Sequence, residues 1–255
     1  MAWSRYAALG DSFTEGMDDP HPATPGIFRG WADLVAGELS KLTPDFGYAN
    51  LAVRGRLFDR IVTEQVGPVL EMKPDLISFA AGGNDVLRRN CDPPTLMKRF
   101  EGVIGELRGS GADVLIFRFA DVMSRLPGNK LIAPRILYLN EAVGEIAERQ
   151  GARLVDLWAD GEFANPAMWS TDRLHMSLFG HQRVAAHVLT KLDVPPPAQW
   201  WELPPWPGRK SWARTRADDI QWAGKHLAPW VKRRLQGRSS GDNVMPKRPT
   251  LGPLT

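Results

Sequence analysis

Short apolar runs alternate with longer amphipathic segments along the first three quarters of the chain. The short runs have the length of strands, and they cover residues 6–9, 47–51, 76–80, 114–117 and 154–157. The longer segments have the length and period of helices, and they cover residues 31–42, 59–72, 95–107, 136–149 and 178–192. Strands that alternate with helices predict an α/β fold in which a parallel sheet carries helices on both faces.

The composition indicates the class of protein and its cellular compartment. The 255 residues are 43% apolar and 24% charged, which excludes a wholly disordered or fibrous chain. No apolar run approaches the roughly 18 residues of a membrane-spanning helix, and the first residues lack the basic and apolar regions of a signal peptide. The single cysteine, Cys91, excludes an internal disulfide and a multi-cysteine metal site. We therefore expect a soluble, cytoplasmic protein.

The composition changes at the three consecutive prolines of residues 195–197. Residues 1–197 carry 21 Lys and Arg against 25 Asp and Glu, whereas residues 198–255 carry 11 against 4 and hold six of the ten tryptophans. We expect a folded domain over residues 1–194 and a basic extension rich in Pro and Trp over 195–236. A surface-hugging or disordered tail is expected over 237–255. A helix over residues 217–235, kinked or split at Pro229, is predicted within the extension.

Three interpretations of the extension remain open. Its tryptophans favour a strap that buries their rings on the domain. It could also form a lid that limits substrate size. The third interpretation is contact with nucleic acid or an anionic membrane, because Lys and Arg beside Trp are typical of such surfaces.

Candidate catalytic groups follow the ends of the predicted strands, where ligands of open α/β sheets bind. Ser12 ends a Gly-Asp-Ser turn after the first strand, Gly55 follows the second, and Asn84 follows the third in a Gly-Gly-Asn-Asp sequence. A neutral amide such as that of Asn84, or an unobstructed Gly N–H, suits the stabilisation of an oxyanion. The alternative for each is an ordinary helix cap or turn.

A possible base for Ser12 follows the last strand of the domain. A serine hydroxyl is a poor nucleophile until a base takes its proton, and histidine is the common base because its pKa lies near neutrality. His175 has Asp172 three residues before it, so that a turn can bring the carboxylate to the second ring nitrogen. The other four histidines lack this arrangement; we interpret them as loop, helix-surface or cap residues.

These residues resemble the motifs of the SGNH hydrolases, also called GDSL esterases or lipases. Ser12, Gly55, Asn84 and the Asp172/His175 pair occur in the order and approximate spacing of that family. The resemblance implies a three-layer α/β/α sandwich with a flavodoxin-like, five-stranded parallel sheet, and hydrolysis through an acyl-enzyme without metal. It implies that Ser12 is the nucleophile, His175 the base and Asp172 its orienter. It also implies that the N–H groups of Ser12 and Gly55 and the amide of Asn84 form the oxyanion hole.

The resemblance covers about residues 5–192 and says nothing of the extension. It departs from the family at Phe13, where the usual residue is leucine. It leaves acyl transfer and thioester hydrolysis open as alternatives, and a binding module that keeps the fold without catalysis is a further one.

The sequence predicts no cofactor and a small-molecule ester as substrate, and it leaves the oligomeric state undefined. Pocket-lining side chains are predicted among four apolar residues, for which core packing is the alternative: Phe28, Trp31, Met168 and Trp169. Four arginines after strand ends could meet an anionic substrate group or could be ordinary surface residues: Arg54, Arg56, Arg88 and Arg89.

Overall fold

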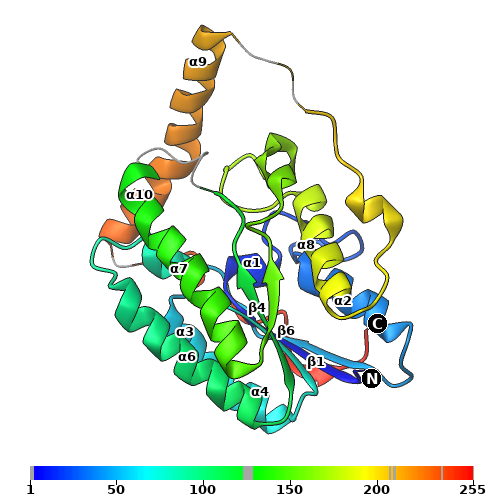
Figure 1. Ribbon diagram of the computed structural model, residues 1–255. Helices are drawn as coiled ribbons and strands as arrows, with labels where there is room; N and C mark the ends of the chain where they lie inside the picture. Colours follow the sequence, from blue (N-terminus) through cyan, green and yellow to red (C-terminus); the bar gives the residue numbers. More distant parts are fainter. Residues whose placement is uncertain (1–2, 123–128, 207, 209–210, 237, 255) are drawn as a thin grey trace.

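A computed structural model of the chain describes residues 3–122, 129–206, 208, 211–236 and 238–254. A six-stranded sheet forms its centre, with strand order β5-β4-β3-β1-β2-β6 (Figure 1). The first five strands are mutually parallel, and they are β1 (Arg5–Gly10), β2 (Gly47–Asn50), β3 (Leu76–Ala80), β4 (Asp113–Arg118) and β5 (Arg153–Asp156). The sixth strand, β6 (Arg248–Gly252), pairs antiparallel with β2 at the edge of the sheet.

Helices cover both faces of this sheet. One face carries α2 (Gly30–Ser40) and α8 (Leu178–Lys191), which pack on each other. The other carries α3 (Phe58–Ile61), a π-helical turn (Val62–Val66), α4 (Gly67–Met72), α6 (Pro93–Gly109) and α7 (Asn129–Gln150). Shorter elements at the strand ends are α1 (Ser12–Glu15), α5 (Gly83–Val86) and the 3-10 turns Gly161–Ala164 and Pro166–Met168.

The alternation of side chains along the strands explains the three layers. In β1, Tyr6 and Ala8 join the apolar cluster under α2 and α8, whereas Ala7 and Leu9 join the cluster under α6 and α7. All four are fully buried. Because both faces of a parallel sheet are covered, its strands are apolar without alternating with polar residues.

The predicted three-layer sandwich and the five parallel strands in flavodoxin-like order are confirmed. The sixth strand was not expected, because its sequence Arg-Pro-Thr-Leu-Gly lacks the pattern of a buried strand. A proline fits an edge strand, where one side of the backbone needs no partner. The tail over residues 237–255 therefore contributes a strand to the sheet.

The extension lies against the domain at several points. Trp200, in the 3-10 turn Ala198–Trp201, is 7% exposed and packs into the cluster beneath α2 and α8. A long helix follows, formed by α9 (Trp212–Trp222), a π-helical turn (Ala223–Leu227) and α10 (Ala228–Leu235); we call these residues the C-terminal helix. It stands out from the sandwich in Figure 1, in orange.

The C-terminal helix begins earlier than the predicted residue 217, because the Ser211 hydroxyl accepts a hydrogen bond from the N–H of Arg214 and caps the first turn. The π-helical turn ends two residues before Pro229 and accommodates its missing N–H. No helix within the described ranges is long and apolar enough to cross a membrane.

A buried lysine attaches the last residues to the domain. The Lys247 ammonium lies 2.5–3.0 Å from the carbonyl oxygens of Glu15, Phe28 and Arg29, and 2.8 Å from a carboxylate oxygen of Asp33. Only 7% of its side chain is exposed. Burial lowers the pKa of Lys247, while the Asp33 carboxylate opposes that shift.

Candidate functional site

Ser12 begins helix α1 at the carboxyl end of β1. The Asp11 carboxylate accepts a hydrogen bond from the N–H of Phe13 at 3.1 Å, which caps the helix and fixes the turn. The Ser12 hydroxyl oxygen lies 2.9 Å from Nε2 of His175, although 163 positions separate the two residues. The fold thus brings the predicted nucleophile and base into hydrogen-bond contact.

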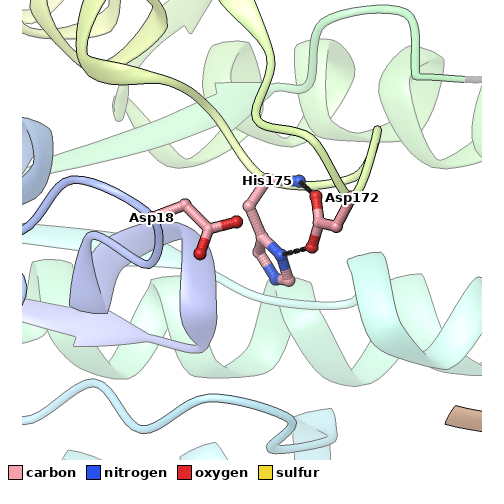
Figure 2. A group of neighbouring side chains, drawn as sticks. All are labelled: Asp18, Asp172 and His175. Atoms are coloured by element: carbon pink, nitrogen blue, oxygen red, sulfur yellow. Dashed lines mark hydrogen bonds and ion pairs between the residues drawn. The ribbon is translucent and has the colours of Figure 1, made fainter. Parts of the chain in front are cut away.

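Asp172 holds the other side of the His175 ring. Its Oδ2 lies 2.5 Å from Nδ1 of His175, while its Oδ1 accepts the N–H of His175 at 3.0 Å (Figure 2). Oδ1 also accepts the N–H of Leu174 at 2.9 Å. Because the Asp172 carboxylate accepts a hydrogen bond from Nδ1–H, the ring proton stays on Nδ1 and the lone pair of Nε2 faces the Ser12 hydroxyl. This arrangement can remove the serine proton.

The carboxylate and the imidazole shift each other's pKa. Burial alone would raise the pKa of Asp172, but hydrogen bonds from His175 and backbone N–H groups, together with the His175 charge, hold it well below its usual value. Burial opposes the charged form of His175, but the Asp172 hydrogen bond and charge outweigh it and raise the His175 pKa. An imidazole with a raised pKa is a stronger base.

A second carboxylate, Asp18, lies beside the His175 ring and was not predicted (Figure 2). The Ser170 hydroxyl lies 2.5 Å from Oδ2 of Asp18 and 2.8 Å from Oδ1 of Asp172, so it bridges the two carboxylates. Potential metal-binding atoms of Asp18, Asp172 and His175 lie within 4.8 Å of one another. The hydrogen bonds described above already account for this cluster.

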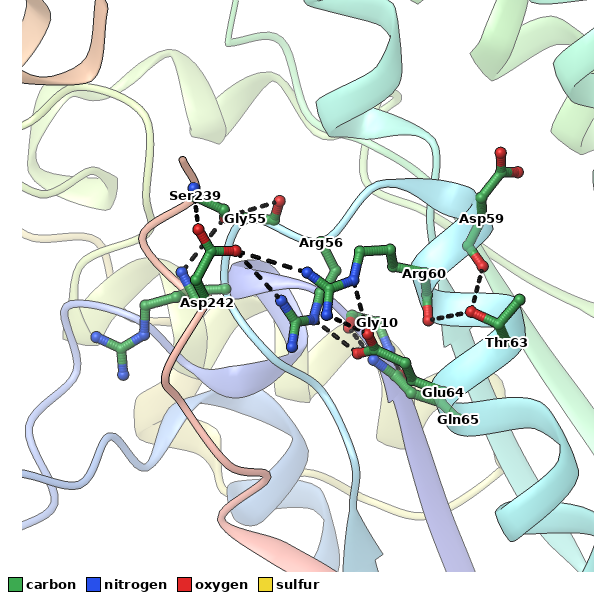
Figure 3. Close-up of polar contacts among 12 residues, drawn as sticks. Gly10, Gly55, Arg56, Asp59, Arg60, Thr63, Glu64, Gln65, Ser239 and Asp242 are labelled. Atoms are coloured by element: carbon green, nitrogen blue, oxygen red, sulfur yellow. Dashed lines mark hydrogen bonds and ion pairs between the residues drawn. The ribbon is translucent and has the colours of Figure 1, made fainter. Parts of the chain in front are cut away.

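Gly55 adopts a left-handed conformation, with φ of +72°, in the loop after β2. A Cβ atom there would lie 2.3 Å from the Ser239 hydroxyl, so only glycine fits. Ser239 donates to the Gly55 carbonyl at 3.2 Å (Figure 3). Within the described ranges, the N–H groups of Gly55 and Ser12 donate no hydrogen bond, and both residues line one pocket.

Ion pairs hold the same loop to the last part of the chain. Asp242 accepts the N–H of Ser239 at 2.7 Å and lies 3.5 Å and 3.9 Å from the guanidinium groups of Arg60 and Arg56 (Figure 3). Residues beyond 237 therefore support the loop that carries Gly55.

Asn84, in α5, reaches the same pocket with its amide. Its Nδ2 donates to Oδ2 of Asp11 at 2.9 Å and to the carbonyl of Arg56 at 3.1 Å. Burial raises the pKa of Asp11 to about 6, against the opposing effect of the Phe13 N–H and the His175 charge. Both amide hydrogens have acceptors here, so binding an oxyanion requires one of them to be shared or redirected.

Two pockets meet at Ser12 and His175. The inner pocket, about 120 Å³, is lined mainly by apolar side chains, which include Phe13, Val86, Phe119, Ile136, Leu139 and Trp169. The outer pocket, about 360 Å³, lies between Ser12 and His175 on one side and the C-terminal helix on the other, which contributes Trp222, Lys225, His226, Leu227, Trp230 and Arg233. An ester placed at Ser12 can therefore extend in two chemically different directions.

The C-terminal helix contacts the loop that carries Asp172 and His175. The indole N–H of Trp222 donates to the Asp172 carbonyl oxygen at 2.8 Å. The Arg173 guanidinium lies 2.7 Å from the Asp219 carboxylate and 5.0 Å from the Trp222 ring centre. We call these contacts the latch. Sequence reasoning could not find them, because they join residues about 50 positions apart.

Some of the predicted pocket-lining residues line a pocket and others do not. Trp169 lines the inner pocket, whereas Phe28, Trp31 and Arg54 line neither the inner nor the outer pocket. Trp31 is fully buried between Phe13 and Phe117, at ring-centre distances of 5.5 Å and 5.0 Å.

Arg54 cannot turn to the pocket because its guanidinium pairs with the buried carboxylate of Glu15, and it also lies over the Phe28 ring. Met168 is likewise a core residue, 1% exposed. Among the remaining arginines, Arg88 reaches a smaller pocket beside Asn84, while Arg56 pairs with Glu64.

His181, predicted as a surface or cap residue, is 1% exposed and lines the inner pocket. Its Nδ1 accepts the N–H of Trp31 at 3.2 Å, and its Nε2 lies 3.1 Å from the Met17 carbonyl. Burial lowers the pKa of His181 to about 4, although the Met17 carbonyl opposes this shift. A neutral ring therefore fixes the loop after α1; a histidine at one position of an amphipathic helix gives no signal of such a role.

Comparison with known proteins identifies the family of the chain. Residues 8–183 match the GDSL-like Lipase/Acylhydrolase family. Esterase TesA of Pseudomonas aeruginosa is 25% identical over 161 residues, which are 63% of this chain and 76% of that protein.

Solved structures share the fold. A crystal structure of TesA, 23% identical, covers 73% of this chain and 97% of its own, with a TM-score of 0.59. LAE5, an alpha/beta hydrolase from the metagenome of Lake Arreo, Spain, is 21% identical and covers 74% and 95%, with a TM-score of 0.61. Axe2, an acetylxylan esterase from Geobacillus stearothermophilus, is 20% identical and covers 73% and 93%, with a TM-score of 0.54.

The family match spans more than half of the chain and includes Ser12, Gly55, Asn84, Asp172 and His175. The chain therefore belongs to the GDSL-like lipase/acylhydrolase family and is a carboxylic ester hydrolase of the GDSL type.

Proposed function

We propose that the chain hydrolyses an ester through a covalent acyl-enzyme on Ser12. The observation that carries this proposal is the hydrogen-bonded series from Ser12 Oγ to His175 Nε2 at 2.9 Å and from His175 Nδ1 to Asp172 at 2.5 Å. Such a series activates a hydroxyl that would otherwise be a poor nucleophile.

In the first half of the reaction, His175 takes the Ser12 proton while Oγ attacks the ester carbonyl carbon. The tetrahedral intermediate collapses when its bond to the alcohol oxygen breaks, and His175 gives its proton to that oxygen. Water then repeats the sequence on the acyl-enzyme, so that the acid leaves and Ser12 regains its proton. Asp172 stays ionised throughout and stabilises the imidazolium that forms in each half.

The oxyanion is proposed to lie against the N–H groups of Ser12 and Gly55 and the amide of Asn84. The two backbone groups have no other acceptor within the described residues, which favours this role. Asn84 joins them when one amide hydrogen is shared between the Arg56 carbonyl and the substrate oxygen. Removing one such donor typically costs about 10²–10³ in rate.

The inner pocket is proposed to receive the acyl group, because its lining is mainly apolar and its volume is small. The names of the similar proteins, esterase TesA and acetylxylan esterase Axe2, agree with ester substrates, and the second agrees with a short acyl group. A short-chain ester is therefore the substrate class we favour.

A fluorophosphonate probe tests the nucleophile directly. The wild-type chain should be labelled on the peptide that contains Ser12, and Ser12→Ala should lose both label and hydrolysis of p-nitrophenyl acetate. Ser240→Ala is the matched control, because Ser240 also lines the outer pocket. Wild-type chain that is folded but unlabelled, or Ser12→Ala that hydrolyses at the parent rate, overturns the proposal.

A further inference from the structure

We infer that the outer pocket binds an anionic group of the substrate, so that the enzyme prefers esters that carry a phosphate or carboxylate on the alcohol side. This inference rests on the proposed function, since it places the ester carbonyl at Ser12. Two of the cations that it uses, Lys225 and Arg233, lie beyond the 8–183 family match.

Two positive side chains line the outer pocket. They are Lys225 and Arg233, which lie eight positions apart on the C-terminal helix. Arg233 also lines a smaller adjoining pocket of about 60 Å³ together with Arg88 and Arg238. Gly55 and Asn84 line both pockets, so the cations gather on the side of the proposed oxyanion hole.

Within the described residues these four cations form no ion pair with a carboxylate, although the charge of Arg88 acts on the Asp85 carboxylate. The one carboxylate that lines either pocket is Asp172, which is hydrogen-bonded to His175. Within the described part of the chain, no carboxylate oxygen lies within 4.0 Å of a charged nitrogen of Lys225, Arg233, Arg88 or Arg238. Like charges on the wall of a cleft produce a positive potential that favours an anion between them.

The latch fixes the position of these positive charges relative to Ser12 and His175. Trp222 donates to the Asp172 carbonyl at 2.8 Å, and Asp219 pairs with Arg173 at 2.7 Å. Lys225 follows Trp222 within the same helix. The positive wall is therefore attached to the loop that carries the base, and not to a freely hanging tail.

The two pockets also suit different parts of the substrate. The inner pocket is lined mainly by apolar side chains, and a charged group there would lose its hydration without compensation. The outer pocket offers cations and two indoles, Trp222 and Trp230. An apolar acyl group fits the first and an anionic alcohol fits the second, with the ester bond between them at Ser12.

The test compares acetate esters whose alcohol sides differ in charge. The chromogenic pair is 4-acetoxy-3-nitrobenzoate and 4-acetoxy-3-nitrobenzamide, and the second pair is 2-acetoxyethyl phosphate and its cationic counterpart acetylcholine, measured by acetate release. The variants are Lys225→Gln, Arg233→Gln and their double variant. Lys232→Gln is the matched control, because Lys232 is exposed on the same helix and lines neither pocket.

We expect kcat/KM to favour the anionic member of at least one pair. Each neutralised cation should lower the ratio of kcat/KM for the anionic ester to that for its partner about threefold, and the double variant about tenfold. The reason is that an exposed ion pair contributes less than about 1 kcal/mol, which is less than a tenfold change. The preference should weaken at high salt, and Lys232→Gln should keep the wild-type ratio. A preference in the phosphate pair or in the carboxylate pair identifies which anion the pocket takes.

Equal kcat/KM values within both pairs, or a ratio that Lys225→Gln and Arg233→Gln leave at the wild-type value, would overturn the inference. Both outcomes leave the proposed function intact as long as Ser12→Ala is inactive. Loss of the proposed function is recognised separately, by hydrolysis of the neutral ester that survives Ser12→Ala.

Discussion

Breaking the latch tests whether the C-terminal helix supports the catalytic loop. Asp219→Asn removes the charge that pairs with Arg173, and Trp222→Phe removes the indole N–H but keeps an aromatic ring. The hydrogen bond to the Asp172 carbonyl should contribute about 1 kcal/mol. The ion pair, with side chains 31% and 38% exposed, should contribute less than about 1 kcal/mol.

Together these contacts stabilise the attached helix by about 1–2 kcal/mol, which corresponds to a factor of roughly 5–30 in the ratio of attached to detached helix. In the double variant, amide hydrogen exchange over residues 214–222 should accelerate by that factor. The rate of fluorophosphonate labelling at Ser12 should fall several-fold, because the loop that carries Asp172 loses its support.

The control is Ile220→Gln, because Ile220 lies on the same helix with 76% of its surface exposed. Two results would refute the reasoning. Unchanged exchange over residues 214–222 means that these contacts do not attach the helix. Faster exchange with wild-type labelling means that the attachment does not reach the triad.

Three further changes test other parts of the structure. Gly55→Ala should lower kcat about 100-fold or more, because its Cβ collides with Ser239 and the strained loop moves its N–H, while KM for p-nitrophenyl acetate changes little. Lys247→Met should lower the free energy of unfolding by about 3 kcal/mol in urea denaturation, because the buried Asp33 partner is left without its counter-charge. The kcat/KM profile should rise with pH through a His175 pKa above its ordinary 6.5, since only the neutral ring accepts a proton; Asp172→Asn should move this limb to lower pH and reduce kcat about 10⁴-fold, as measured in a pH series.

The sequence predicts the sheet well because the strands are buried on both faces. Continuous apolar runs such as residues 114–117 have few alternatives, and helices between the strands favour parallel pairing. The meeting of the candidate residues was predictable for a related reason: parallel strands end at one edge, so turn residues that follow them, such as Ser12 and Asn84, meet there. Residues at strand ends can therefore be recognised from short motifs in the sequence, and the fold brings them together.

What the sequence did not predict depends on pairing between distant residues. Arg54 has the type and position of a substrate-binding arginine, but its guanidinium forms an ion pair with Glu15, 39 positions away. Trp31 has the size of a pocket-lining residue, but its helix turns it into the core. A side chain's type limits what it can bind, whereas its partner decides what it does bind, and the partner is known only from the fold.

The C-terminal residues illustrate how function can depend on chain outside the family match. Cleaving the chain at residue 194 would expose the backbone groups of β2 that now pair with β6, and would leave three carbonyls without the Lys247 ammonium. It would also remove Ser239 from the Gly55 carbonyl and Trp222 from the Asp172 carbonyl. These losses fall on the sheet edge, the loop after α1, the loop that carries Gly55 and the loop that carries Asp172 and His175. The described residues of 198–255 are therefore part of the architecture that holds these loops, and substrate preference has to be measured on the full chain.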